Sequence, residues 1–308
     1  MFPSVFLLAA WATLTACSSS AASFTLSKHQ RLLKSHLRAN NLSIESTKRT
    51  SPSEVVNIFD NFAGHFEEKL NVLEYSAPQQ VSKAASSRIE EVRQGQPYHS
   101  ALDAGCGTGL SGPHLRPLIE GSLVGVDLSP KMAQLAAELL IDDGPVPVVK
   151  DRMRRCDEAA RSALGNPPRL YDGIFTADLV EMENATPLEG YGFHSKNLPS
   201  SFDLVVSADV LCYFGDLKDV IQAFSQKMAP GGDLIFSCET MGEGDYNWVR
   251  QVHGRYAHDP DYVAKMASEA GLVMLEQQPF TPRLELGEKV LGTLHVFHKP
   301  SVTGDGTE

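Results

Sequence analysis

The chain has 308 residues, of which 42% are hydrophobic and 21% are charged, and it carries a formal net charge of -11 at pH 7. These values fit a soluble globular protein of one large domain or two small ones. They disfavour nucleic acid as a partner, because affinity for nucleic acid comes largely from Lys and Arg side chains that neutralise phosphates.

Residues 1–50 differ from the rest of the chain, since they hold six of the 27 Lys and Arg residues but one of the 38 acidic ones. Residues 5–16 form an apolar run that is typical of a signal-peptide core and too short to span a membrane. The following stretch is rich in Ser, Lys and Arg, as transit peptides are. This tandem, with Phe24 after small residues, resembles the bipartite presequence of algae with complex plastids. We therefore expect residues 1–50 to be a plastid-targeting presequence and the mature protein to have no stable membrane insertion.

Three other destinations stay open. Leu14 to Cys17 resembles a bacterial lipobox, which would make the protein a membrane-anchored lipoprotein. The Arg-rich and Ser-rich composition is also compatible with a mitochondrial address. An N-terminal segment without any address would leave the protein in the cytoplasm.

Residues 54–94 have the first regular pattern after the presequence. Apolar side chains such as Phe62 and Phe66 recur there at helix-like intervals, so one face is apolar. Pro78 interrupts the pattern, and we expect a second helix from Gln79 to Val92. The segment is predicted to be a helical N-terminal cap.

Residues 98–300 alternate short apolar runs with helical patterns. This alternation predicts an α/β domain with a doubly wound, mostly parallel seven-stranded sheet. The last strand follows its predecessor without a helix between them, so we expect it to be antiparallel. Residues 142–169 and 182–200 are predicted to be lids or loosely ordered loops, and residues 301–308 a disordered tail. The expected strands are residues 100–103, 122–126, 173–177, 202–207, 233–238, 272–276 and 293–297.

A glycine-rich loop follows the first expected strand, with glycines at 105, 107 and 109. Glycine allows a sharp turn and close approach of a ligand to the backbone. Asp127 ends the next strand, where a carboxylate can accept both hydroxyls of a ribose. Gly107, Gly109 and Gly112 also satisfy the GxGxxG dinucleotide pattern, which alone is a weak signal. Asp103, just before the loop, argues against a pyrophosphate because the two negative charges would repel each other.

Two further motifs follow in order: PheAspLeuValValSerAlaAsp, which ends at Asp209, and AlaProGlyGly, at residues 229–232. Together with the glycine loop and Asp127, they resemble class I S-adenosylmethionine-dependent methyltransferases over residues 100–240. The resemblance implies a Rossmann-like methyltransferase fold and S-adenosyl-L-methionine as the cofactor. Residues 58–70 and 254–258 also resemble a bacterial-type predicted methyltransferase subfamily that is often fused to tetratricopeptide repeats, which are absent here.

The resemblance implies cofactor contacts at the loop and at the strand ends. Asp103 would face the methionine ammonium, Asp127 the ribose hydroxyls and Asp178 the adenine amino group. The expected cofactor-binding residues are Asp103, Ala104, Gly105, Cys106, Gly107, Gly109, Asp127, Leu128, Met132, Asp178, Leu179, Asp209 and Val210.

Methyl transfer is an in-line displacement, so alignment of the reacting atoms is the main requirement and can supply about 7–11 kcal/mol. A general base is needed only where the nucleophile starts protonated. The candidate catalytic residues are Asp209, Tyr213 and His258, and the guanidinium of Arg255 would match a substrate carboxylate. We expect the cap to cover the open side of the cofactor. The candidate substrate-binding residues are Phe62, His65, Tyr75, Arg255 and Tyr256.

The sequence thus predicts an S-adenosylmethionine-dependent methyltransferase with a small-molecule acceptor. No metal site is expected, because the five cysteines form no pair with ligand spacing. The alternatives are a nicotinamide-dependent oxidoreductase, a catalytically silent S-adenosylmethionine-binding assembly factor, and a protein or RNA methyltransferase. The sequence gives no indication of the oligomeric state.

Overall fold

The structure is a computed structural model. Within the part of the chain that it describes, no helix has the length and apolar character needed to cross a lipid bilayer. The expected presequence up to residue 47 and the tail from residue 302 lie outside the described residues, as does most of the stretch 142–169. The described residues are 48–141, 155, 157–163, 166, 168–193, 195–241, 246–251, 253–285 and 287–301.

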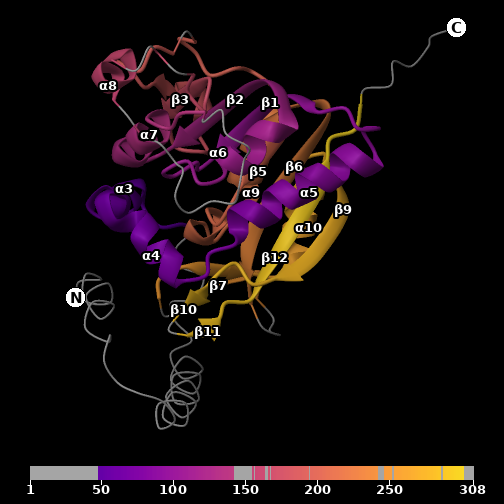
Figure 1. The fold of residues 1–308 in the computed structure, drawn as a ribbon. Coiled ribbons are helices and arrows are strands. Elements are labelled where there is room, and N and C mark those ends of the chain that lie inside the picture. The colour runs from indigo at the N-terminus through magenta and orange to yellow at the C-terminus, as the bar shows by residue number, and fades with distance from the viewer. Residues whose placement is uncertain are drawn as a thin grey trace, which may run out of the picture.

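A ten-stranded sheet forms the centre of the molecule (Figure 1). Its order is β4-β3-β2-β1-β5-β6-β12-β9, with β8 pairing β6 and β7 pairing β8. The seven main strands are β1 (Tyr98–Ala104), β2 (Ile119–Asp127), β3 (Gly173–Thr176), β5 (Phe202–Ser207), β6 (Met228–Thr240), β9 (Val273–Phe280) and β12 (Gly292–His298). The short ones are β4 (Thr186–Pro187), β7 (Trp248–Arg250) and β8 (Tyr256–His258), and β10 (Leu284–Glu285) pairs β11 (Glu288–Lys289) separately.

The sheet is mostly parallel, as the sequence predicted. Leu102 in β1 pairs with Val124 in β2 and with Val205 in β5, in both cases in parallel. β12 is antiparallel to both neighbours, and its Leu294 lies between Ser237 of β6 and Gln278 of β9. The predicted antiparallel last strand is therefore confirmed.

Helices cover both faces of the sheet (Figure 1). On one face, Phe202 and Val205 of β5 pack with α9 (Lys218–Lys227) and α10 (Pro260–Glu269). On the other, Leu204 and Val206 pack with α5 (Ala77–Glu91), α6 (Gly112–Leu115) and α7 (Pro130–Ala137). Neighbouring residues of one strand, such as Leu204 and Val205, thus point to opposite faces of the sheet and belong to different cores. This is the doubly wound arrangement. Within the described residues and outside the cap, the remaining helices are α8 (Glu158–Ala163) and the short 3₁₀ turns η2 (Arg116–Leu118), η3 (Met182–Asn184) and η4 (Leu211–Tyr213).

The cap consists of α3 (Pro52–Phe62), η1 (Ala63–His65) and α4 (Phe66–Val72), and it leads into α5. Ser51 caps α3 by accepting a hydrogen bond from the Glu54 amide. The cap docks on α7, where the Ser129 hydroxyl donates to the Asp60 carboxylate at 2.6 Å. The predicted helix boundary at Pro78 differs slightly from the structure, because α5 begins at Ala77 and not at Gln79. Pro78 lies in the first turn of α5, where its missing N–H is tolerated.

Residues 48–50, which the sequence assigned to the presequence, belong to the folded domain. The Thr50 amide donates to the Tyr213 carbonyl at 2.9 Å, and the amides of Gly215 and Asp216 donate to the Lys48 carbonyl at 2.8 and 2.9 Å. The folded domain therefore includes the chain from Lys48 onward.

Candidate cofactor and acceptor site

The main cavity lies at the carboxyl ends of β1, β2, β3 and β5, under the cap. About 990 Å³ there is not filled by protein atoms, part of it open to solvent, which is enough for a nucleoside-sized ligand. Open α/β sheets bind ligands at this edge. The lining includes residues 105–108, 127–128, 178–179 and 208–210, the cap residues Phe59, Phe66 and Leu70, and Arg49 with Thr50.

The glycine loop packs tightly between two strand ends. The amides of Gly105 and Cys106 both donate to the Val126 carbonyl, at 2.7 and 3.0 Å. Gly105 has a φ of +79°, and a Cβ there would lie 2.5 Å from a methyl group of Val210. A side chain at residue 105 is thus excluded, and the loop presents its backbone to the cavity.

Asp127 lies at the end of β2 and faces the cavity. Its two carboxylate oxygens accept hydrogen bonds from the amides of Gly107 and Ser129, both at 2.8 Å. Burial raises the pKa of Asp127 to about 6, although these bonds lower it. Each oxygen keeps a free lone pair, so the carboxylate can still accept two ribose hydroxyls.

Asp103 lies behind the loop and is buried. One carboxylate oxygen accepts a hydrogen bond from the Tyr171 hydroxyl at 2.7 Å, and the other is buried without a hydrogen-bond partner among the described residues. Burial raises the pKa of Asp103 to about 7, against the Tyr171 bond, which lowers it.

Asp178 and Leu179, after β3, line the cavity as expected. The Asp178 carboxylate has a partner that the sequence did not predict, since it accepts a hydrogen bond from the Arg49 guanidinium at 2.8 Å. Four expected cofactor residues, Asp103, Ala104, Gly109 and Met132, are not among the described lining residues. Ala104 and Met132 are fully buried, and a Cβ at Gly109 would lie 2.5 Å from Leu139, so these residues support the loop.

Asp209 lines the cavity but does not present a free carboxylate. Arg283, itself buried, donates to both of its oxygens at 2.7 and 3.0 Å and also bonds Glu239. Asp209 has a φ of +58°, a strained conformation for an L residue. Asp209 thus lies at the edge of the pocket as predicted, but the ion pair occupies the carboxylate and leaves it unavailable for catalysis.

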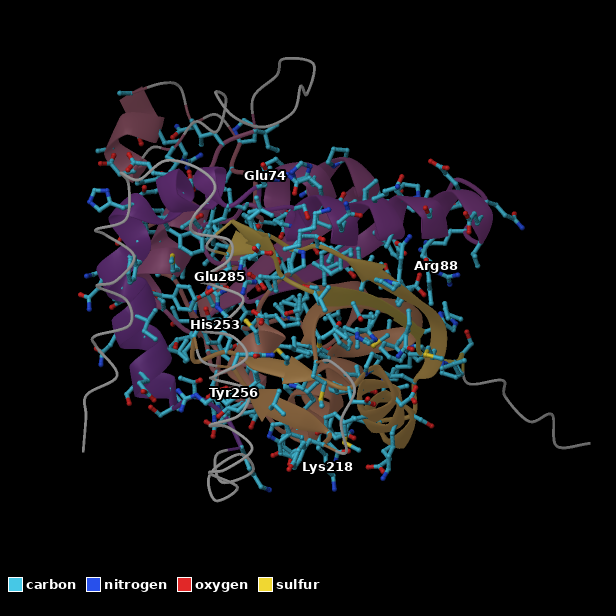
Figure 2. All side chains as sticks on the ribbon, turned by 90° about the horizontal axis from the view of Figure 1, so that it is seen from below. Glu74, Arg88, Lys218, His253, Tyr256 and Glu285 are labelled. Atoms are coloured by element: carbon cyan, nitrogen blue, oxygen red, sulfur yellow. The ribbon has the colours of Figure 1, made fainter. Side chains whose placement is uncertain are left out.

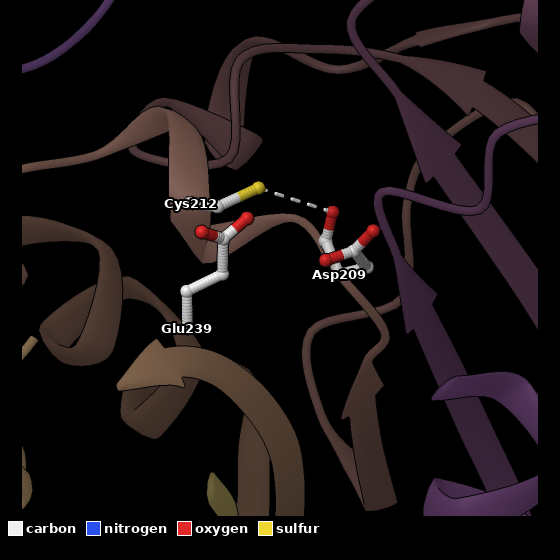
Figure 3. Close-up of side chains that lie close together, drawn as sticks. All are labelled: Asp209, Cys212 and Glu239. Atoms are coloured by element: carbon white, nitrogen blue, oxygen red, sulfur yellow. Dashed lines mark hydrogen bonds between the residues drawn. The ribbon is translucent and has the colours of Figure 1, made fainter. Parts of the chain in front are cut away.

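Asp209, Cys212 and Glu239 lie close enough to hold a cation (Figure 3). The Cys212 thiol donates to the Asp209 carbonyl at 3.5 Å. However, the Arg283 guanidinium already bonds both carboxylates, so positive charge is supplied by the chain itself.

The other two catalytic candidates differ from each other. Tyr213 lines the cavity, with its ring edge-on to Phe59 at 5.4 Å, and burial raises its pKa to about 12. His258 is fully buried, and its Nε2 donates to the carbonyls of Phe214 and Gly215 at 2.8 and 3.2 Å. Burial lowers the pKa of His258 to about 4. The geometry contradicts the predicted catalytic role of His258, because the buried ring holds β8 against the turn after β5 through these hydrogen bonds.

Of the substrate candidates, Tyr75 and Arg255 line the cavity and Phe62, His65 and Tyr256 do not. The His65 side chain is 75% exposed, and Tyr256 is fully buried. The 3₁₀ turn η1 changes the helical phase between α3 and α4. The cap therefore contributes Phe59 and Phe66, whose rings are in edge contact at 5.9 Å.

Comparison with known proteins decides the class of the domain. Residues 102–234 match the family of methyltransferase domains. These residues are similar to a methyltransferase domain. S-adenosyl-L-methionine is the cofactor that this domain implies, as the sequence predicted. No curated protein sequence matches the chain.

Several solved methyltransferase structures are similar to this chain, and the first of them, with a TM-score above 0.5, shares its fold. The Burkholderia thailandensis 1,6-didemethyltoxoflavin-N1-methyltransferase has a TM-score of 0.51 at 14% identity, over 84% of this chain and 94% of that one. The magnesium protoporphyrin IX methyltransferase of Synechocystis has a TM-score of 0.47 at 16% identity, over 76% and 87%. A putative sarcosine dimethylglycine methyltransferase from Galdieria sulphuraria has 0.47 at 13%, over 72% and 86%.

The cavity of the methyltransferase domain fits this cofactor chemically. The hydroxyl oxygens of Thr50 and Thr108 line it and are buried without hydrogen-bond partners among the described residues. At Gly107 a Cβ would meet open space, so nothing blocks a ligand there. A ligand with hydroxyl, amino and ammonium donors would meet these acceptors and the carboxylate of Asp127.

Proposed function

We propose that the protein transfers a methyl group from S-adenosylmethionine to a small molecule held between the cap and the end of β5. The observation that carries this proposal is the position of Asp127. Its carboxylate, fixed by the Gly107 amide, faces the same cavity as the aromatic cap residues. One cavity thus offers both a ribose-binding carboxylate and an apolar compartment beside it.

The acceptor compartment is aromatic, with one cation. The rings of Phe59 and Phe66 from the cap are in edge contact with each other, and Phe59 also contacts Tyr213. Tyr75 and Arg255 line the same cavity. Apolar walls with few polar groups are typical of small-molecule sites. The Burkholderia neighbour holds 1,6-didemethyltoxoflavin together with S-adenosylhomocysteine, and we extend that kind of acceptor, a small molecule, to this chain.

The described pocket residues include no histidine and no evident general base. Burial raises the pKa of Tyr75 and Tyr213, and Asp209 is paired with Arg283. We therefore propose an acceptor whose nucleophile carries a lone pair without help, such as a carboxylate or a neutral amine. For such an acceptor, the contribution of the protein is orientation and exclusion of water.

Replacement of Asp127 by Ala tests the cofactor site. We expect S-adenosylhomocysteine to bind about 10–100-fold more weakly, because hydrogen bonds to a charged acceptor contribute about 1.5–3 kcal/mol. Calorimetric titration measures this, and Asp219→Ala, an exposed acid on α9, is the control that should bind normally. Unchanged affinity in Asp127→Ala would refute the proposed site.

Two further measurements separate the competing functions. S-adenosylhomocysteine should raise the melting temperature of the protein and NADH should not, since a ligand of the folded state stabilises it. Stabilisation by NADH alone would favour an oxidoreductase. Incubation of a plastid extract with an isotopically labelled methyl donor should yield a labelled small molecule, and labelling of protein or RNA alone, or of nothing, would contradict the proposed acceptor class.

We also propose that the chain upstream of Lys48 directs the protein to a plastid and that the protein is related to the subfamily often fused to tetratricopeptide repeats. The first proposal is supported by the apolar run and the basic, Ser-rich stretch, and the second by residues 58–70 and 254–258. A fluorescent reporter fused after residue 47 should accumulate in the plastid of an alga with complex plastids. Cytoplasmic fluorescence would count against the targeting proposal.

A further inference from the structure

Arg49 and Thr50 line the cavity from a short segment that precedes the cap. Arg49 forms an antiparallel bridge with Phe214, and the Thr50 amide donates to the Tyr213 carbonyl at 2.9 Å. These backbone bonds hold the segment against the turn that follows β5. The segment is therefore a fixed wall of the pocket.

The Arg49 side chain connects two parts of the pocket. Its guanidinium lies over the Phe214 ring, 4.8 Å from the ring centre, and donates to the Asp178 carboxylate at 2.8 Å. Phe214 follows β5, whereas Asp178 follows β3. Arg49 thus spans the mouth of the pocket and fixes the orientation of the Asp178 carboxylate.

The segment leaves two buried polar atoms without hydrogen-bond partners among the described residues: the Nε of Arg49 and the hydroxyl oxygen of Thr50. Thr50 is 5% exposed. Buried polar groups are normally hydrogen-bonded, because leaving one unpaired is costly. A ligand in the cavity that these two residues line would satisfy both atoms.

We infer that Arg49 and Thr50 bind the nucleoside part of the cofactor, and that Arg49 also positions Asp178 for the adenine amino group. This inference rests on the proposed function. A carboxylate only accepts hydrogen bonds, so an Asp178 held by Arg49 favours an amino group over a carbonyl at that position. The pair therefore determines the preference for adenine.

The inference also limits where the presequence is removed. Cleavage after Thr50 would take away a wall of the pocket, whereas cleavage before Lys48 would leave it in place.

Titration of the full chain with two ligands tests the inference: S-adenosylhomocysteine and the analogue in which oxygen replaces the adenine amino group. For Arg49→Ala we expect about tenfold weaker binding of S-adenosylhomocysteine, the equivalent of about 1.4 kcal/mol. The analogue should lose only about two- to threefold, because it shares the direct contact with Arg49 but makes no amino-group bond to Asp178, so the preference for adenine over the analogue becomes smaller. A change in stability alone would weaken both ligands equally.

A second variant keeps the test informative if Arg49→Ala folds poorly. Thr50→Val preserves the shape of the side chain and removes the unpaired hydroxyl, and we expect about three- to tenfold weaker binding of S-adenosylhomocysteine. Arg93→Ala is the matched control, since the Arg93 guanidinium also lies on an aromatic ring, 4.3 Å from the centre of Tyr98, away from the pocket. It should bind both ligands as the unaltered protein does.

The outcomes separate the two proposals. If the unaltered protein binds S-adenosylhomocysteine but Arg49→Ala and Thr50→Val bind it equally well, this inference is overturned and the proposed function stands. If the unaltered protein does not bind it at all, the proposed function fails and this inference fails with it.

Discussion

The charge state of Asp103 is sensitive to its single hydrogen bond. The carboxylate is buried behind the glycine loop, Tyr171 donates to one oxygen, and the other oxygen has no hydrogen-bond partner within the described residues. With a pKa of about 7, the group loses its proton close to neutral pH. We propose that this carboxylate attracts the ammonium of the cofactor, and such an attraction would grow as the pH rises through 7.

Tyr171→Phe tests this dependence at the residue scale. The Tyr171 bond lowers the pKa of Asp103, so its loss raises that pKa further and keeps the carboxyl protonated to higher pH. We expect the affinity for S-adenosylhomocysteine to rise with pH in both proteins, with a midpoint at higher pH in the variant. Titrations between pH 5.5 and 9 measure it.

The control is Tyr191→Phe, which removes a hydroxyl that contacts Glu138 at 3.4 Å, outside the cavity lining. Its profile should coincide with that of the unaltered protein. Coincident profiles for Tyr171→Phe would show that Asp103 does not control binding.

At the scale of elements, the cap is joined to the pocket through its aromatic side chains. Phe59 of α3 contacts Phe66 of α4 at 5.9 Å and Tyr213 of η4 at 5.4 Å, both edge to face. Because η1 separates α3 from α4, Phe59 is the residue that joins both cap helices to the turn after β5.

Phe59→Ala should loosen the cap. Each aromatic pair contributes about 0.5–1.5 kcal/mol beyond its buried area, so docking of the cap should weaken by about 1–3 kcal/mol. Ligand binding should weaken too, because the docked cap lines the cavity. Calorimetry with S-adenosylhomocysteine and the KM for an identified acceptor measure it. Asn57→Ala, exposed on the same helix, should change neither quantity. Equal losses in both variants would mean that any change on α3, and not the loss of the aromatic contact, weakens binding.

Element prediction from sequence succeeded where the local pattern was strong. The seven main strands have between four and 13 residues. All were predicted to within four residues of their bounds, except that β6 begins earlier, at Met228. The short strands β4, β7 and β8 were not predicted, because two or three residues are too few to show an alternation of apolar and polar side chains. Pro78 was misplaced because a proline in a first helical turn and a proline between helices look alike in sequence.

The part of the site that could be predicted consists of residues that lie close together in the sequence. The glycine loop and Asp127 are about twenty residues apart on consecutive elements, so their spacing alone indicates a nucleoside site. Arg49 and Arg283 were missed, because Arg49 lies 129 positions from Asp178 and Arg283 lies 74 from Asp209. Pairs so distant are brought together by tertiary packing, which no short window of sequence reveals.

At the scale of the whole molecule, one buried carboxylate joins four elements at the end of the sheet opposite the pocket. Asp233 of β6 accepts hydrogen bonds from Arg88 of α5 at 3.1 and 3.2 Å, from Tyr98 of β1 at 2.8 Å and from His298 of β12 at 2.9 Å. Figure 2 shows Arg88 well apart from Glu285 and His253, which lie near the pocket side. This cluster thus supports the fold and not the chemistry.

Asp233→Asn should destabilise the protein without harming the site. Breaking a buried ion pair typically costs about 3–5 kcal/mol, which corresponds to a fall in melting temperature of roughly 6–20 °C for a domain of this size. Thermal unfolding without ligand measures the fall. At a temperature where the variant is folded, S-adenosylhomocysteine should bind with unaltered affinity, and Asp219→Asn should melt normally. Weaker binding would mean that the two ends of the sheet are coupled.

The place of β12 governs when this sheet can be completed during synthesis. Among the described strands, β9 pairs with β12 and with no other, and β12 in turn joins it to β6. On the ribosome, residues 228–240 and 273–280 emerge before residues 292–298, which must enter between them. Until then the nascent chain carries two open strand edges, which are prone to pair with other chains. Completion of the sheet is therefore one of the last steps in the folding of the newly synthesised chain.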